Sequence, residues 1–193
     1  MSKLVLLFLV VLCVWESSAQ CDRRLEVNYP LFVYFNMADV GGYPIDSGFE
    51  SKSIRLEIDT TETVCVETVY EGYLLRVSNY DSLDVSLPSV DRALLVYAEA
   101  LIDTAWLPVT SVKASDCGNS YHCTNLKGRY TVAFPTPAFT GTYSTRLRYV
   151  LIYEGKKLYS NEIDAQIHPE MWKISNFSEA DREWVLDVNH YLK

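Results

Sequence analysis

Apolar and polar residues alternate with a period of two along much of the chain. Between residues 54 and 59, isoleucine and leucine are separated by arginine, glutamate and aspartate, which predicts a strand with one buried face. The same alternation places Leu83, Val85 and Leu87 on one face, and Pro88 is expected to end that strand. Further strands are predicted at residues 64–69, 73–77, 128–134 and 158–167, with a polar turn at 78–82 and with Pro135 and Pro137 closing the strand at 128–134.

Two segments are apolar on both faces. Residues 93–102 fit either a helix or a buried strand, and their Val and Tyr content favours the strand. In residues 145–153, Val150 and Ile152 make the second face apolar as well, so this strand is predicted to be central and covered on both sides. Gly155 then provides a hairpin turn into the returning strand.

Short strands joined by Gly, Pro, Asn and Asp turns predict a β-sandwich rather than alternating strands and helices. The sandwich is expected to span residues 20–170, as one domain or as two β subdomains with a boundary near 104–116. The tail, residues 171–193, differs in pattern. Ser178 with an acid three residues later is typical of a helix start, and apolar residues around Trp184 recur at helical spacing. A short amphipathic C-terminal helix is therefore predicted.

Residues 1–19 have the three regions of a secretory signal peptide. Lys3 gives a basic start, residues 4–15 are almost entirely apolar, and Ser17 and Ala19 are small residues at the −3 and −1 positions of a cleavage site. The alternative is a membrane anchor, but the apolar run is shorter than the roughly 20 residues that a bilayer requires. We therefore expect a secreted, extracellular protein that begins at Gln20.

The charge of the chain narrows the classes of partner. The formal net charge is −8, and removal of residues 1–19 leaves it unchanged because one Lys and one Glu depart together. An acidic chain with no basic run is poorly suited to nucleic acid or to an anionic membrane surface. Contact with a membrane is therefore expected only through a partner, unless the chain is an ectodomain truncated ahead of an anchor.

Four cysteines remain once Cys13 leaves with the signal peptide. An even number in a secreted chain indicates two disulfides, for which three pairings exist. Cys117 and Cys123 enclose five residues that include Gly and Asn, which favours a local bridge between them. Cys21 would then pair with Cys65, and closing that longer loop would stabilise the fold by about 3–4 kcal/mol.

No motif in the sequence indicates catalysis or cofactor binding. The chain contains no nucleophile elbow, phosphate loop or zinc-protease motif. Cys117, His122 and Cys123 could be read as zinc ligands, but a fourth ligand is missing and a secreted context favours a disulfide. The remaining histidines, His168 and His190, lie apart in the sequence. We therefore expect neither an enzyme, a metal nor a cofactor.

Two features suit an extracellular interaction protein. Asn176, followed by Phe and Ser, satisfies the rule for N-glycosylation. The chain also contains fourteen tyrosines, and tyrosine is favoured at recognition surfaces although strands bury it as well.

Three elements of the later half resemble a known family. They are the Cys117/Cys123 pair before a strand, Gly141-Thr142 leading into residues 146–152, and the Tyr-Ser-Asn-Glu-Ile stretch at 159–163. Residues 117–167 resemble the membrane-proximal half of the uroplakin II/III ectodomains. The resemblance implies a non-enzymatic cell-surface ectodomain that assembles laterally with tetraspanin-type partners. Residues 171–193 are amphipathic where that family has a transmembrane helix, which implies a soluble relative.

A similar strand–turn–strand pattern recurs in fibronectin type III-like domains. The predicted fold class is therefore all-β, an immunoglobulin- or fibronectin III-like β-sandwich with a short C-terminal α-helix. The predicted function is that of a secreted, non-enzymatic protein that binds an extracellular or cell-surface protein. The alternatives are a secreted carrier of a small apolar ligand and a hydrolase with a dispersed active site.

Overall fold

The described part of the chain is built from strands. The computed structural model describes residues 21, 23–27, 31–32, 35, 41–45, 54–67, 69–112, 115 and 118–173. Within them, the helical elements are two short 3-10 turns, η1 (Gly118–Ser120) and η2 (Pro169–Trp172). The expected all-β class is confirmed. The predicted signal peptide, Cys117, Asn176, His190 and the predicted C-terminal helix lie outside the described residues.

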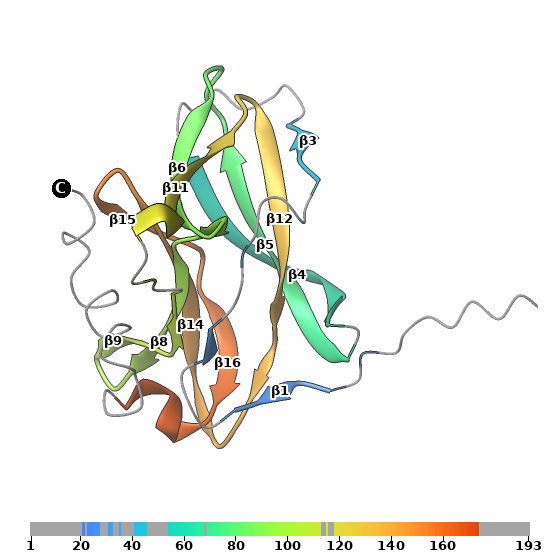
Figure 1. The fold of residues 1–193 in the computed structure, drawn as a ribbon. Coiled ribbons are helices and arrows are strands. Elements are labelled where there is room, and N and C mark those ends of the chain that lie inside the picture. The colour runs from blue at the N-terminus through green and yellow to red at the C-terminus, as the bar shows by residue number, and fades with distance from the viewer. Residues whose placement is uncertain are drawn as a thin grey trace, which may run out of the picture.

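Two larger sheets form the body (Figure 1). The four-stranded sheet has the order β3 (Tyr43–Pro44), β12 (Tyr130–Pro137), β5 (Tyr70–Asn79), β4 (Ile54–Val66). In the five-stranded sheet β14 (Tyr143–Tyr153) is central, with β8 (Val96–Ile102) and then β9 (Ala105–Pro108) on one side and both β15 (Lys156–Tyr159) and β16 (Ile163–Ile167) on the other.

Three smaller sheets complete the described topology. One has the order β11 (Tyr121–Leu126), β6 (Val85–Val90), β7 (Ala93–Leu94). Two parallel pairs join β1 (Leu25–Glu26) to β13 (Phe139–Thr140) and β2 (Leu31–Phe32) to β10 (Thr110–Ser111).

The core lies between the two larger sheets. Leu75 on β5 and Leu151 on β14 belong to one cluster of buried side chains that spans both sheets. Phe35 is fully buried and meets Phe134 and Tyr149 edge-on, with ring centroids 5.8 and 6.1 Å apart. Burying each such side chain contributes about 1.5–3 kcal/mol. A pocket of about 10 Å³ borders Tyr149, which is too small for an apolar ligand of the kind that a carrier would hold.

Three of the predicted strands are where they were expected. Residues 54–59 open β4, where Leu56 and Ile58 are buried. Residues 93–102 form β7 and the buried strand β8 rather than a helix. β14 is central, and Val150 and Ile152 lie in a second buried cluster on the opposite face from the main core.

The prolines do not end strands as expected. Pro88 lies inside β6, opposite Cys123 of β11, and β7 on the other side pairs only with Ser89 and Val90. Pro135 lies within β12, which ends only at Pro137, and both prolines are beyond the two residues that β3 pairs. A missing N–H is tolerated where no neighbouring strand requires it.

The turn expected at residues 78–82 begins later. β5 continues through Asn79, whose buried amide donates to the carbonyl oxygens of Leu83 (2.8 Å) and Leu126 (3.2 Å). This amide thereby holds the turn, and Leu83 is 73% exposed instead of facing the core. The alternation at Leu83 thus belongs to a turn and not to a strand.

The hairpin at Gly155 is confirmed. Glu154 and Gly155 have φ values of 47° and 71°, as a type I′ turn requires. The returning strand is divided into β15 and β16, and both pair with β14.

One predicted disulfide is present. Cys21 and Cys65 are bonded, with Cα atoms 5.5 Å apart, and the bridge fastens the N-terminal segment to β4. Cys123 is exposed and has no disulfide partner among the described residues; its pairing with Cys117 stays a prediction.

Residues 104–116 were considered as a boundary between two β subdomains. β8 and β14, which lie on either side of these residues in the sequence, pair directly in one sheet. No helix in the described part of the chain is long and apolar enough to cross a membrane.

Candidate recognition surface

The outer face of the five-stranded sheet carries a buried ion pair. Arg148 of β14 lies directly opposite Glu99 of β8 in the strand register. Its Nε and Nη2 atoms donate to Glu99 Oε2 at 3.0 and 2.7 Å. The Glu99 side chain is only 7% exposed and the Arg148 side chain 18%. Two hydrogen bonds from one guanidinium to a buried carboxylate fix the plane of the arginine.

Two aromatic rings enclose the same guanidinium. The Arg148 Cζ atom lies 4.1 Å from the ring centroid of Trp106 on β9 and 4.0 Å from that of Tyr159 on β15. A planar cation offers both faces to aromatic rings. Tyr159 is 47% exposed, so the end of this arrangement is accessible to solvent. We call Trp106, Arg148 and Tyr159 the arginine row.

A second cation lies beside the row. Lys157 Nζ is 5.5 Å from the ring centroid of Tyr97 and 3.8 Å from Glu99 Oε1. The Tyr97 hydroxyl donates to Glu99 Oε1 at 3.2 Å. Burial, followed by the nearby Glu99 carboxylate, raises the pKa of Tyr97 above its ordinary value. The phenol therefore stays protonated at neutral pH and keeps donating to Glu99.

The break between β15 and β16 positions the row. Directly after Tyr159, the Ser160 hydroxyl accepts from the backbone N–H of Tyr149 at 2.9 Å. Asn161 then uses its side-chain amide on Ile58 of β4, accepting from its N–H at 2.8 Å and donating to its carbonyl at 3.0 Å. The break is therefore fixed to its own sheet and to the opposite one.

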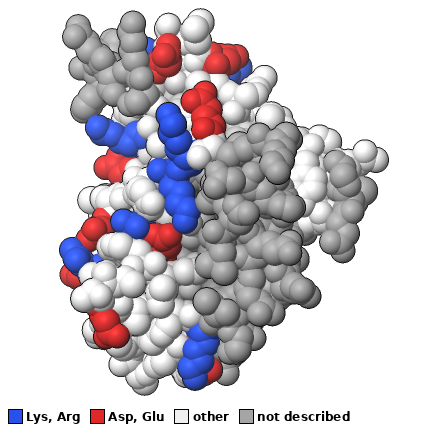
Figure 2. All heavy atoms as spheres, turned by 90° about the vertical axis from the view of Figure 1, so that its left-hand side faces the viewer, with Lys and Arg blue, Asp and Glu red and all other residues white. Residues whose placement is uncertain are grey.

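The next residue continues the charged face. Glu162 pairs with Arg146 at 2.6 Å, and both side chains are largely exposed. Figure 2, which looks at this side of the molecule, shows Lys and Arg interspersed with Asp and Glu. An exposed pair of this kind contributes about 0–1 kcal/mol, so its main effect is on the charge pattern of the face.

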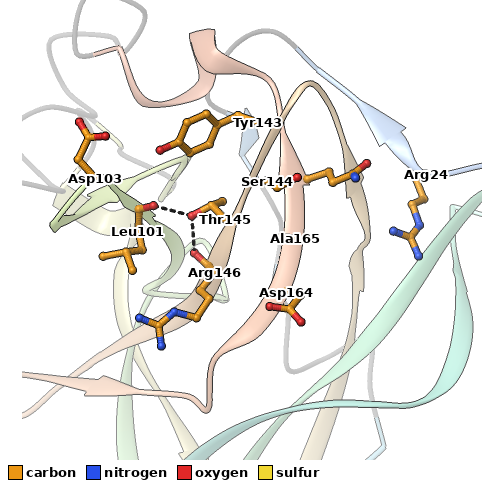
Figure 3. Close-up of a pocket in the computed structure, with 10 residues that line it drawn as sticks. Arg24, Leu101, Asp103, Tyr143, Ser144, Thr145, Arg146, Asp164 and Ala165 are labelled. Carbon is orange, nitrogen blue, oxygen red and sulfur yellow. Dashed lines mark hydrogen bonds between the residues drawn. The ribbon is translucent and has the colours of Figure 1, made fainter.

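A trough of about 630 Å³ lies toward the η2 end of the same sheet. In Figure 3, strands β14 and β16 form its floor, with Asp103 and Arg24 on opposite sides. Thr145 Oγ1 lies 2.5 Å from the carbonyl oxygen of Leu101 and so bridges β14 to β8 where their pairing has ended. Its lining residues are Arg24, Leu101, Asp103, Tyr143, Ser144, Thr145, Arg146, Asp164, Ala165 and Gln166.

The sequence-predicted site residues do not come together. His122 lies exposed on β11, while His168 caps η2 by accepting from the N–H of Glu170 at 3.2 Å. Within the described residues, no group of three His, Cys, Asp or Glu side chains could hold a metal ion. Cys117 and His190, which also entered those hypotheses, lie outside this part of the chain.

Sequence reasoning did not find the arginine row. Its one available signal was Arg146 and Arg148 at alternate positions of a strand that is otherwise apolar. Trp106 and Tyr159 come from other strands, and their approach to Arg148 depends on the register of the whole sheet.

Comparisons with protein-family models, with curated proteins and with solved structures found no match. The resemblance to uroplakin ectodomains stays a prediction.

Proposed function

We propose that this chain is a secreted, non-enzymatic interaction protein that binds an extracellular or cell-surface protein through the outer face of its five-stranded sheet. The observation that carries the proposal is the arginine row, in which Arg148 is enclosed by Trp106 and Tyr159 on an accessible face. Trp, Tyr and Arg are the residue types most enriched at the energetic centres of protein interfaces.

Pre-organisation strengthens this assignment. Binding costs less when the contacting side chains are already ordered. Arg148 is held by Glu99 at one edge of its guanidinium and by two rings against its faces. A partner that stacks on Tyr159 would therefore order few additional side chains.

Several features of the chain support the extracellular setting. The Cys21–Cys65 disulfide suits an oxidising compartment, and residues 1–19 have the pattern of a signal peptide. A glycan at Asn176 belongs to the same proposal. We further propose an immunoglobulin- or fibronectin III-like sandwich related to uroplakin ectodomains, since the stretch that resembles them, residues 117–167, includes Arg148 and Tyr159 of the row. Membrane contact would then occur through the partner.

The test is capture of the secreted protein on intact epithelial cells. We expect saturable binding, with Tyr159→Ala weakening it by about tenfold or more because an interface anchor is lost. Tyr43→Ala is the matched control, since Tyr43 is also an exposed tyrosine (39%) but lies on β3 of the other sheet.

Both variants must keep the thermal unfolding midpoint of the parent protein for this comparison. Absence of saturable binding to cells would overturn the proposed function. Equal binding by the Tyr159 and Tyr43 variants would remove the arginine row as its site.

A further inference from the structure

The floor of the trough is a grid of four polar side chains on two paired strands. Ser144 lies opposite Gln166, and Arg146 opposite Asp164, in the register of β14 and β16. Directly opposed residues have Cβ atoms about 5 Å apart, and residues two apart along a strand are separated by about 7 Å. Figure 3 shows Asp103 on the opposite side of the trough from Arg24.

Most of these groups have unused hydrogen-bonding capacity. Among the described residues, no hydrogen bond or ion pair involves the side chains of Asp103, Ser144, Asp164 or Gln166. Two carboxylates thus offer only acceptors, whereas the carboxamide and the hydroxyl offer both donors and acceptors. Apolar lining is limited: among the trough residues, those with mainly apolar side chains are Leu101, Tyr143 and Ala165.

The cations at the trough are already neutralised. Arg24 lies 3.4 Å from Glu71, and Arg146 lies 2.6 Å from Glu162. With Asp103 and Asp164 in addition, the described residues around the trough carry more negative than positive charge. An anionic ligand such as a phosphate is therefore disfavoured, and an apolar ligand would leave the polar floor without partners.

We propose that this trough binds a neutral saccharide. Sugar hydroxyls donate to the two carboxylates and accept from Arg146, Gln166 and Ser144, so one ligand can satisfy both kinds of group. Tyr143, the neighbour of Ser144 on β14, also borders the trough, and its ring packs against Trp172 at the edge of the main core with centroids 4.9 Å apart. This site is separate from the arginine row, and the saccharide proposal does not depend on the proposed protein partner.

A basic side chain is the main competitor for two free carboxylates. An ammonium group only donates hydrogen bonds. It would therefore bind the carboxylate of Asp103 or Asp164 but offer no acceptor to the donors of Arg146 and Gln166. It would also fill a small part of a cavity of about 630 Å³. Both considerations favour a polyhydroxylated ligand over an amine.

The experiment is saturation-transfer NMR on the full secreted chain with defined probes: lactose, α1,2-mannobiose and triacetylchitotriose as neutral saccharides, 3′-sialyllactose as an anionic one, and Nα-acetyl-lysine amide as the amine. We expect saturable binding of at least one neutral saccharide. Gln166→Ala and Asp164→Ala should each weaken it by about tenfold, as expected when hydrogen bonds to a ligand are lost.

Glu57→Ala is the control, because it removes an exposed carboxylate from β4 in the other sheet. It should leave saccharide binding unchanged. Binding of the lysine derivative alone, or of the sialylated probe alone, would overturn the proposal, as would the absence of binding by every neutral probe. Equal loss in Glu57→Ala and Gln166→Ala would place the saccharide elsewhere and overturn it as well.

Discussion

Asn161 closes the edge of the opposite sheet at Ile58. Its amide oxygen accepts from the Ile58 N–H at 2.8 Å and its amide nitrogen donates to the Ile58 carbonyl at 3.0 Å. One side chain thus takes the place of a neighbouring strand at the outer edge of β4. Edge strands expose such unpaired groups, and proteins commonly protect them.

Replacing Asn161 should therefore lower the stability more than its exposed position implies. Asn161→Ala removes the partners of two backbone groups and is expected to lower the free energy of unfolding by about 1–3 kcal/mol. Urea unfolding followed by fluorescence measures this loss. Asn125→Ala is the control, since Asn125 accepts one exposed hydrogen bond from Ser86. Equal losses in the two variants would refute the edge-closing role.

The buried and exposed ion pairs of the five-stranded sheet should differ sharply. Glu99→Ala leaves Arg148 without its buried carboxylate, and we expect a loss of about 3 kcal/mol or more. Glu162→Ala breaks the exposed pair with Arg146 and should cost about 1 kcal/mol or less. Chemical denaturation of both variants gives the comparison. A loss below 1 kcal/mol for Glu99→Ala would contradict the structural importance given to this pair.

Asp59 makes stability depend on acid pH. Hydrogen bonds from the Thr61 side chain and backbone, followed by one from Arg76, lower the pKa of Asp59 from 3.8 to about 2. Because the folded-state pKa is depressed, this contribution is fully present above the unfolded-state value and is lost as the pH falls from about 4 toward 2. Thr61→Val should raise the pKa of Asp59 toward 3.8, as measured by NMR titration of the carboxyl carbon.

Thr63→Val is the control for that titration, because Thr63 is an exposed threonine on the same strand. It should leave the Asp59 pKa where it is. An unchanged pKa in Thr61→Val would show that the threonine does not stabilise the carboxylate.

The Cys21–Cys65 bridge encloses a long loop. With a sequence separation of 44, its removal should lower the free energy of unfolding by about 4 kcal/mol in the chain-entropy description. The double variant Cys21→Ser/Cys65→Ser, compared with the parent protein in calorimetry, tests this. A double variant as stable as the parent would show that the bridge contributes little.

How much of this structure follows from the sequence depends on how local each signal is. β14 was predictable because Val150 and Ile152 reveal a second apolar face within one segment. The place of Pro88 was not, because a proline is tolerated in β6 only where β7 ends early, and that depends on pairing with a distant strand. The arginine row was harder still to predict from any one segment, since Trp106 and Tyr159 reach Arg148 from two other strands.

The four residues from Tyr159 to Glu162 have a thermodynamic consequence. Each is fixed by a contact outside the segment, and Asn161 extends this network to the other sheet. The row cannot loosen without weakening the association of the two sheets. A ligand that recognises only the ordered row would therefore increase the free energy of unfolding of the whole molecule by RT ln(1 + L/Kd), where L is the free ligand concentration, so a shift in melting temperature could report binding in a screen for the partner.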